Sequence, residues 1–392
     1  MMSIELWWLL ALPVFFTLGW VAARIDLNHL LKESRALPRS YFKGLNFLLN
    51  EQPDKAIEAF LEAAKVDPET IELHFALGSL FRRRGETDRA IRVHQNLVDR
   101  EGLRDSQRLH ALAELGLDYL KAGLLDRAEE IFLKLRGSAR DEEALKALLE
   151  IYQQEKEWLK AIDIAEGMPN QTDYLWQKDI AEFHCELASN AILHGRNDEA
   201  HRHVDAALAA NRKCVRATIL LGDLSLAEGR DEQAIEAWTR VEQQNPVYLS
   251  LVADKLMAVL HKHGRSAYGS QLLRGYLERH SSLDLLDAAF QSELESGGPE
   301  PAYKLVRNEL QRNPTLLGLD KLLEARVLVA PAEGRADLEL VKNLIHGHTR
   351  RVARYRCDNC GFKARQFHWR CPACGGWETY PPKRTEEFDL TP

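Results

Sequence analysis

The sequence predicts an all-α solenoid of helical repeats, preceded by one membrane-spanning helix and followed by a small metal-binding ribbon. Three observations carry this prediction. An apolar run stands near the N-terminus, an alanine recurs about every 34 residues through the middle, and four cysteines lie within eighteen residues near the C-terminus. They divide the 392 residues into a transmembrane anchor (1–24), a juxtamembrane linker (25–36), a solenoid (37–348) and a metal-binding domain (349–392).

The bulk composition is that of an ordinary folded protein, with 28% charged and 45% hydrophobic residues. A formal net charge of −7 argues against nucleic acid as the partner of the whole chain. Basic residues nevertheless cluster around the cysteines: Arg350, Arg351, Arg354, Arg356, Lys363, Arg365 and Arg370. This basic face keeps a nucleic-acid-binding ribbon open as one alternative.

Residues 4–23 have the length and composition of a transmembrane helix. Glu5 is their only charged residue, and twenty residues of helix span about 30 Å, the thickness of the hydrocarbon core. No basic residue precedes the run and no small-residue cleavage site is present, which disfavours a signal peptide. Five basic residues follow the run against two acidic ones: Arg24, Lys32, Arg35, Arg39 and Lys43 against Asp26 and Glu33. The positive-inside rule then places the N-terminus outside and everything from Arg24 onwards in the cytoplasm.

The middle of the chain repeats with a period that identifies its helical class. Successive spacings are 34, 38, 33, 39, 34 and 68 residues between these alanines: Ala56, Ala90, Ala128, Ala161, Ala200, Ala234 and Ala302. Two helices in about 34 residues are the tetratricopeptide signature. A small residue stands twelve positions before five of the alanines: Gly44, Gly78, Gly116, Ala188 and Gly222. A large aromatic one stands four positions after three of them: Phe60, Phe132 and Trp238. Small residues let the paired helices approach, and large ones fill the gap.

This template predicts about eight repeats between Leu37 and Pro314. It is weak between Asn245 and Leu283, where Tyr268 takes the place of the alanine. Residues 316–347 are expected to form terminal helices that seal the open end of the core, as solenoids require.

Three residues of one repeat mark a candidate partner-binding groove. Arg82 and Arg83 stand late in the first helix of their repeat, which places them near the concave side together with Phe75. Solenoids bind proteins on such surfaces, although a solvated basic face is the alternative. The sequence contains no phosphate-binding loop, nucleophile elbow or zinc-protease motif, so we expect no enzymatic activity.

The cysteines near the C-terminus form two C-x-x-C-G knuckles separated by ten residues: Cys357 with Cys360, and Cys371 with Cys374. Each knuckle can aim two sulfurs at one point, because the glycine after it adopts a positive φ readily. Four thiolates on one centre suit zinc or a single iron ion. Aromatic residues are expected to surround the sulfurs, one of them docking the ribbon onto the last repeats: Tyr355, Phe362, Trp369 and Trp377. The other two cysteines, Cys185 and Cys214, are predicted to be isolated, buried and unpaired.

With these features together, the chain resembles the lipopolysaccharide assembly protein B family of Gram-negative bacteria. The most specific stretches are residues 46–49, 77–82, 84–86, 88–92, 355–357, 360–362, 369, 371–372 and 374. The resemblance implies an inner-membrane protein with a periplasmic N-terminus, cytoplasmic repeats and a rubredoxin-type module holding one iron ion, with zinc as the alternative. It also implies a non-catalytic adaptor that restrains lipopolysaccharide synthesis. The adaptor would help a membrane-bound AAA protease degrade the deacetylase that commits material to lipid A.

The partners implied by the resemblance are that protease, the deacetylase, other lipopolysaccharide-assembly proteins and the inner membrane. No nucleic acid is expected, and a homodimer is left open. The loop between the cysteine pairs is much shorter than in free-standing rubredoxins, which counts against a redox role. An electron-transfer protein and a nucleic-acid-binding ribbon therefore stand as the alternative functions.

Overall fold

The computed structural model describes residues 16–17, 39–50, 52–66, 70–168, 173–280 and 282–386. Apart from Phe16 and Thr17, the predicted membrane helix over residues 4–23 lies outside this part of the chain, as does the predicted linker. Within the described part, no helix combines the length and the apolar character that crossing a bilayer requires.

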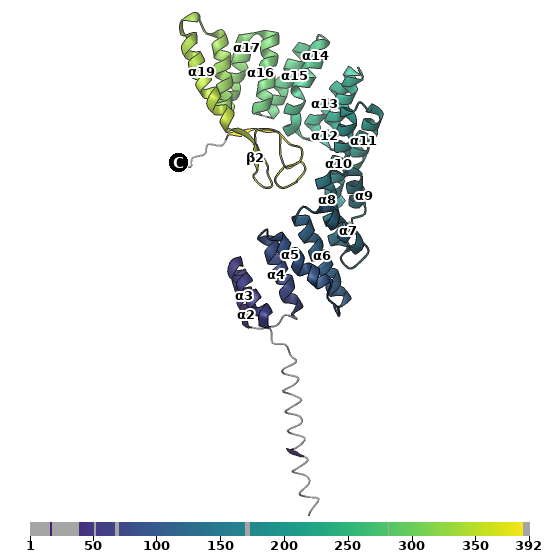
Figure 1. The fold of residues 1–392 in the computed structure, drawn as a ribbon. Helices are drawn as coiled ribbons and strands as arrows, with labels where there is room; N and C mark the ends of the chain where they lie inside the picture. The colour runs from purple at the N-terminus through teal and green to yellow at the C-terminus, as the bar shows by residue number, and fades with distance from the viewer. Residues whose placement is uncertain are drawn as a thin grey trace, which may run out of the picture. The chain divides into compact units, whose positions relative to one another are not determined.

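The described chain is a succession of helix pairs followed by a small β-sheet (Figure 1). The helices fall into two compact units, Met1–Glu155 and Lys156–Pro392. Helices of the first unit are α2 (Arg39–Leu49), α3 (Pro53–Val66), α4 (Ile71–Arg83), α5 (Thr87–Val98), α6 (Asp105–Lys121), α7 (Leu125–Leu135) and α8 (Asp141–Glu155). Those of the second are α9 (Trp158–Glu166), α10 (Asp173–Leu193), α11 (Asn197–Ala210), α12 (Val215–Ala227), α13 (Asp231–Gln244), the 3-10 helix η1 (Pro246–Leu251), α14 (Ala253–Lys262), α15 (Ser266–Arg279), α16 (Leu283–Gly297), α17 (Pro299–Arg312), α18 (Leu316–Val329) and α19 (Ala332–Val352).

A small buried residue stands fourth in the second helix of each described pair between Arg39 and Arg312, as the alanine spacing predicts. The seven predicted alanines occupy this position in seven pairs, and each is fully buried. In α15 the expectation for Tyr268 was wrong: Tyr268 is half exposed, and Gly269 is the small fourth residue. The spacing from Ala234 to Gly269 is therefore one residue longer than the template assumed.

The predicted close approach between a glycine and a large aromatic residue is present in three of the described pairs. A Cβ added to Gly222 of α12 would lie 2.3 Å from Nε1 of Trp238 in α13, and Trp238 is fully buried. A Cβ added to Gly44 would likewise overlap the ring of Phe60, and one added to Gly116 would overlap the ring of Phe132. The large aromatic residue of one helix thus fills the space left by the glycine of its partner.

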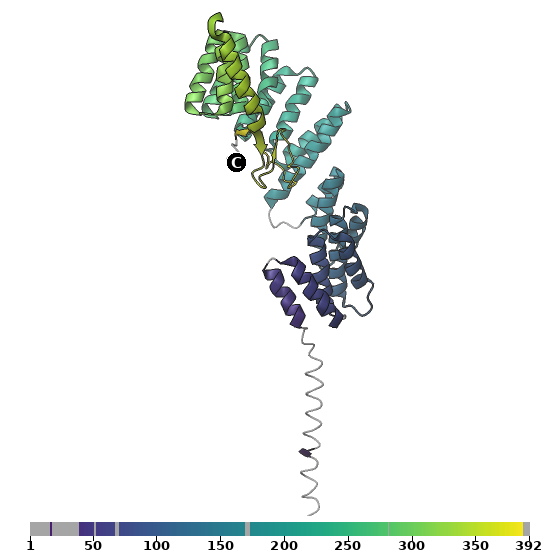
Figure 2. The same cartoon turned by 60° about the vertical axis from the view of Figure 1, so that its left-hand side comes forward.

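The C-terminal sheet follows directly from the last helix and belongs to the second unit. Its strands are β1 (Ala353–Arg356), β2 (Lys363–Ala364) and β3 (Thr385–Glu386), in the order β2-β1-β3 with both pairs antiparallel. Tyr355 pairs with Ala364, and Arg354 with Thr385. Figures 1 and 2 both show this ribbon beside the helices of its own unit.

Candidate metal centre

Two tight turns bring the four predicted cysteines together. Gly361 and Gly375 have φ values of 75° and 70°, which glycine adopts without strain. Their N–H groups donate to the carbonyl oxygens of Cys357 and Cys371, each at 2.9 Å. Each C-x-x-C-G segment is therefore a closed turn with both of its sulfurs on one side.

The sulfur positions fit a single tetrahedral ion. All four Sγ atoms lie within 4.8 Å of one another. The Sγ atoms of Cys357 and Cys374 are 3.8 Å apart, and those of Cys360 and Cys371 are 3.7 Å apart. Metal–sulfur bonds of about 2.3 Å place the corners of a tetrahedron about 3.8 Å apart. The donor set suits both zinc and iron, and a bound ion would cross-link the two turns.

Hydrogen-bond donors favour the thiolate form that a metal requires at two of the four cysteines, Cys357 and Cys374. Burial raises the pKa of Cys357, but the Thr379 hydroxyl, 3.4 Å from its Sγ, and backbone N–H groups of Cys360 and Asn359 outweigh burial and lower this pKa to about 6. The N–H of Gly376 lowers the pKa of Cys374, assisted by the Asn359 side-chain amide at 3.6 Å.

The apolar surroundings of the sulfurs were only partly predicted. Cys357 and Cys371 are buried together with Tyr380, which the sequence analysis missed. Half-buried apolar residues pack against this group: Tyr355, Phe362, Ala364 and Phe367. Placing Trp369 and Trp377 in the same shell was wrong, because both rings lie against the helical repeats.

Trp369 attaches the ribbon to the core of the second unit. Its ring stacks on that of Tyr248 in η1, with centroids 5.4 Å apart and an interplanar angle of 2°. Phe367 meets the same tyrosine edge-on at 6.4 Å. Tyr248 is itself buried, so these contacts extend the core of the repeats into the ribbon.

Trp377 attaches the ribbon to the beginning of the same unit. Its ring makes edge contacts with Trp158 of α9 at 6.0 Å and with Phe183 of α10 at 6.1 Å. The Arg216 guanidinium lies 5.4 Å from the Trp369 ring and 6.0 Å from the Trp377 ring. Such cation–π contacts are strongest where water is excluded, as at this buried arginine.

Polar contacts complete the attachment at the C-terminal end of the ribbon. Arg384 forms an ion pair with Asp284 of α16, and its backbone N–H donates to the same carboxylate at 3.1 Å. The Ser250 hydroxyl donates to the carbonyl of Pro382 at 3.2 Å. The ribbon was expected to dock onto the last repeats only. It contacts helices from α9 to α16, so that expectation was too narrow.

Two carboxylates lie against Arg216, one buried (Glu182) and one half-buried (Glu186). Its Nη1 lies 3.2 Å from Glu182 and 2.8 Å from Glu186, both on α10. Burial raises the pKa of Glu182 to about 7, although Arg216 opposes the shift. Burial likewise raises the pKa of Asp179 to about 6. The sequence analysis did not identify these residues. The signal that could have found them was a charged residue within an apolar stretch of a predicted helix.

The raised pKa of Glu182 predicts that this unit loses stability as pH rises. Its ordinary value is 4.5, so between pH 4.5 and 7 the folded state holds a proton that the unfolded state has released. This contribution is complete below pH 4.5 and is lost by about pH 7, at a cost of up to about 3 kcal/mol. Glu182→Gln should flatten the pH dependence of the unfolding free energy, measured by urea denaturation. Glu186→Gln is the control at the half-exposed partner, and an unchanged slope in Glu182→Gln would contradict this assignment.

Cys185 and Cys214 are buried and free, as predicted, but they are not isolated in space. Their Sγ atoms are 3.7 Å apart, across α10 and the N-terminal cap of α12. Twenty-nine residues separate them in sequence, so no local spacing could have indicated this contact.

The three residues of the predicted partner-binding groove have different environments in the first unit. Arg82 bonds inward, with Nη1 2.7 Å from Asp118 and Nη2 2.7 Å from Glu114. Phe75 is half buried, its ring stacked on His110 at 4.2 Å. Arg83 is exposed. Arg82 therefore contributes to folding, and only Arg83 presents its charge to solvent.

We expect Arg82→Ala to lower the unfolding free energy of the first unit by about 3 kcal/mol. The substitution removes one of the two side chains that bond Asp118, a fully buried carboxylate whose other oxygen contacts His94, so this carboxylate loses part of its compensation. Arg83→Ala on the same helix is the matched control and should change stability by less than about 0.5 kcal/mol. Urea denaturation of the two variants tests this, and equal losses would contradict the assigned ion pairs.

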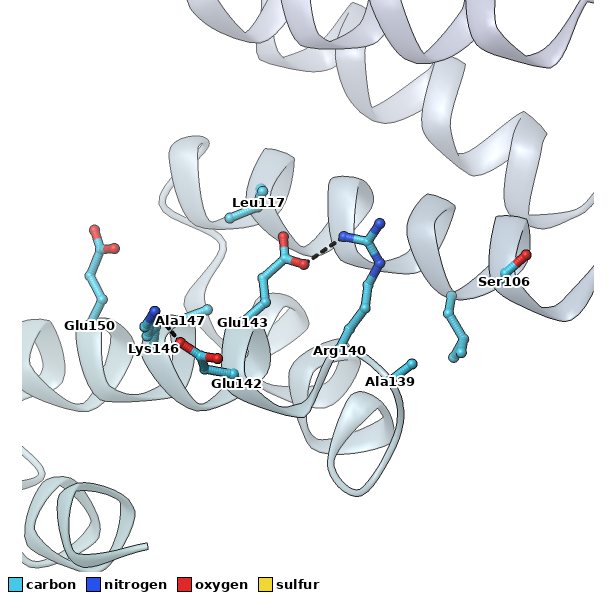
Figure 3. Close-up of a pocket in the computed structure, with 10 residues that line it drawn as sticks. Ser106, Leu117, Ala139, Arg140, Glu142, Glu143, Lys146, Ala147 and Glu150 are labelled. Atoms are coloured by element: carbon cyan, nitrogen blue, oxygen red, sulfur yellow. Dashed lines mark hydrogen bonds and ion pairs between the residues drawn. The ribbon is translucent and has the colours of Figure 1, made fainter. Parts of the chain in front are cut away.

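The first unit has a groove between α6 and α8 that carries charged side chains. It encloses about 710 Å³ and is bordered by Leu109 and Leu117 on the apolar side. Figure 3 shows its two ion pairs, Arg140 with Glu143 and Lys146 with Glu142, each 2.6 Å long. Because these charges are paired with one another, the groove presents a surface of mixed charge.

Comparisons with known proteins agree with this architecture. A family model described as "Rubredoxin metal binding domain" matches residues 355–382, and one described as "Tetratricopeptide repeat" matches residues 43–101 and 185–247. Lipopolysaccharide assembly protein B of Escherichia coli (strain K12) is 36% identical over 380 residues, covering 96% of this chain and 97% of that protein. The protein of the same name from Haemophilus influenzae (strain ATCC 51907 / DSM 11121 / KW20 / Rd) is 31% identical over 399 residues, covering 98% and 100%. A solved tetratricopeptide repeat protein from Parabacteroides merdae covers 78% of this chain and 100% of that chain at 14% identity, but its TM-score of 0.28 supports no conclusion.

Proposed function

The chain belongs to the lipopolysaccharide assembly protein B family, and from this membership we propose that it is a membrane-tethered, non-catalytic adaptor that restrains lipopolysaccharide synthesis. The observation that carries the proposal is the 36% identity over 96% of the chain, which spans both the repeats and the cysteine ribbon. The name of the relatives points to lipopolysaccharide assembly, and the helical repeats point to protein binding.

In this proposal the adaptor brings two proteins together at the inner membrane. Residues 1–24 form a single-pass helix with its N-terminus in the periplasm, and the repeats and ribbon lie in the cytoplasm. The repeats bind the deacetylase that commits material to lipid A and deliver it to a membrane-bound AAA protease. Tethering raises the local concentration of both partners, so the chain needs no catalytic group of its own.

The ribbon has a structural part in this proposal. An iron ion, or zinc as the alternative, would be held by Cys357, Cys360, Cys371 and Cys374 and would stabilise the ribbon fold. The ribbon's own residues Trp369 and Trp377 then pack on η1, α9 and α10, which joins distant repeats of the second unit. The partner-binding surface would therefore depend on the ribbon being folded.

Reconstitution tests the proposed function directly. The protease, the deacetylase and the full-length chain are combined in lipid bilayers, and the half-life of the deacetylase is measured with and without the chain. We expect the chain to shorten this half-life, and expect a version in which a soluble tag replaces residues 1–24 to be much less effective. An unchanged half-life with the full-length chain would overturn the proposal.

Electron transfer is an alternative with one specific observation in its favour. Cys360 and Cys374 are exposed, which would bring an iron ion at this site close to a redox partner. A ferric four-thiolate centre is red and reducible, whereas a zinc centre is colourless. The absorption spectrum of the purified protein, before and after dithionite, therefore decides whether this alternative stays open.

A further inference from the structure

A second group of thiols lies outside the metal centre, in the core of the second unit. The Sγ atoms of Cys185 and Cys214 are 3.7 Å apart, and both residues are fully buried. Cys185 belongs to α10, and Cys214 is the N-cap residue of α12. Two unbonded sulfurs therefore touch where the first helices of two successive helix pairs meet.

The surroundings of this contact leave the two sulfurs room to approach further. The other buried residues of their apolar cluster are all alanines: Ala181, Ala207 and Ala217. The Cys214 side chain makes no capping hydrogen bond at the start of α12, although serine, which has the same shape, is a preferred cap there. The thiol of Cys214 thus faces Cys185 and not the end of the helix.

Glu182 provides a proton acceptor beside the two thiols. The Cys214 thiol donates to Oε1 of Glu182 at 3.8 Å, while Oε2 of the same carboxylate pairs with Arg216. Burial raises the pKa of Glu182 to about 7, so near neutral pH its carboxylate can take up the thiol proton. Burial also raises the pKa of Cys185, which keeps that thiol protonated. Cys214 therefore has a neighbour that can accept its proton, whereas Cys185 retains its own.

A bound metal ion is the other use that two adjacent thiols could have. Among the described residues, however, only the four ribbon cysteines form a close group of three or more ligating side chains. The Arg216 guanidinium beside Glu182 would also repel a cation at this place. Oxidation to a disulfide needs neither a third ligand nor a net charge, so it fits these two thiols better.

We propose that Cys185 and Cys214 are a redox-modification site, at which hydrogen peroxide forms a reversible disulfide that ties α12 to α10. The Cys214 thiol passes its proton to Glu182, and its sulfur attacks one oxygen of the peroxide. The O–O bond breaks, Cys214 becomes a sulfenic acid, and the released hydroxide takes the proton from Glu182 to form water. The Cys185 sulfur then attacks the sulfenic sulfur, and its proton leaves with the hydroxyl group as a second water. Two electrons have passed from the two sulfurs to the peroxide.

The disulfide would act on the part of α12 that holds the ribbon. Arg216 stands two residues after Cys214 and lies against the rings of Trp369 and Trp377. Full burial of both sulfurs admits only a small oxidant, which selects hydrogen peroxide over bulky disulfides such as oxidised glutathione. In reducing compartments disulfides are transient and serve catalysis or redox sensing. The position of the two thiols therefore suits a sensor of peroxide behind the residue that anchors the ribbon.

Peptide mapping of the full-length, metal-loaded chain tests the proposal. The native protein is treated with hydrogen peroxide, then unfolded in urea with iodoacetamide to block the remaining thiols, and digested with trypsin. Cleavage after lysine and arginine isolates Cys185 in peptide 179–196 and Cys214 in peptide 214–216. We expect these two peptides to be joined, with two hydrogen atoms fewer than their sum, and to separate after dithiothreitol. A digest without this joined product, whether the two cysteines are blocked or separately oxidised, would overturn the proposal.

Urea denaturation measures whether the disulfide ties the two helices together. We expect the midpoint of the second unit to be higher after peroxide and to return with dithiothreitol, because the link restricts the unfolded chain over 29 residues. Cys185→Ala is the matched control, and its midpoint should be the same before and after peroxide. A midpoint of the unmodified chain that does not rise, or an equal rise in Cys185→Ala, would overturn the proposal.

Discussion

Replacing Cys371 with serine should unfold the ribbon over residues 355–382 while leaving the helical repeats folded. A segment this short buries too little apolar surface to fold without a cross-link. Metal binding at a four-thiolate site is worth on the order of 10 kcal/mol, and in small domains it supplies the folding energy. Cys371 is buried in the ribbon, and a serine hydroxyl in its place would not replace the lost bond between its sulfur and the metal.

Metal content and limited proteolysis measure this effect together. We expect Cys371→Ser to lose the single bound ion and to become cleavable within the ribbon. Cys185→Ala is the matched control, because Cys185 is equally buried but lies in the repeats; it should keep one ion per chain. A protease-resistant ribbon in Cys371→Ser would show that the fold does not need the four-cysteine centre.

Replacing Arg216 with alanine should detach the ribbon from the repeats and lower the unfolding free energy of the second unit by about 3 kcal/mol at pH 8. The guanidinium lies near the rings of Trp369 and Trp377 and pairs with Glu182, which is almost fully buried. Removing one partner of a buried ion pair leaves an uncompensated charge. The loss should shrink at pH 5, because Glu182 then takes up a proton.

Arg216→Lys separates charge from shape in this contact. Lysine keeps the positive charge but lacks the planar group that stacks on two indole rings and bonds two carboxylates. An intermediate loss of stability is expected, with tryptophan fluorescence of the ribbon shifted towards the exposed state. A lysine variant as stable as the parent would limit the role of Arg216 to its charge. Equal losses for alanine at pH 5 and pH 8 would contradict the part assigned to Glu182.

Local spacing accounts for what the sequence could predict. The helix pairs follow from an alanine that recurs once per pair, because each pair needs one close approach at the same turn. The metal centre follows from two C-x-x-C-G segments, because each is a complete turn whose geometry its own five residues determine. The position assigned to Tyr268 was wrong by one residue, because the spacing from Ala234 to Gly269 is 35 residues where the template assumed 34.

Local spacing could not predict the contacts between segments that lie far apart in the sequence. Trp369 stacks on Tyr248 and Trp377 reaches Trp158, across more than a hundred residues in each case. Arg82 was expected on a partner-binding surface, but its ion-pair partners Glu114 and Asp118 lie 32 and 36 residues away. An arginine in a helix has the same local pattern whether it faces solvent or a neighbouring helix. Only the folded chain distinguishes the two.

In the proposed function this chain acts by binding its partners, and its metal only stabilises the ribbon. The most direct test loads the full-length protein with zinc or with iron and measures the affinity of each form for the deacetylase. We expect equal affinities, because both ions fit the same four sulfurs and would give the ribbon the same shape. Binding by the iron form alone, lost on changing its oxidation state, would contradict it.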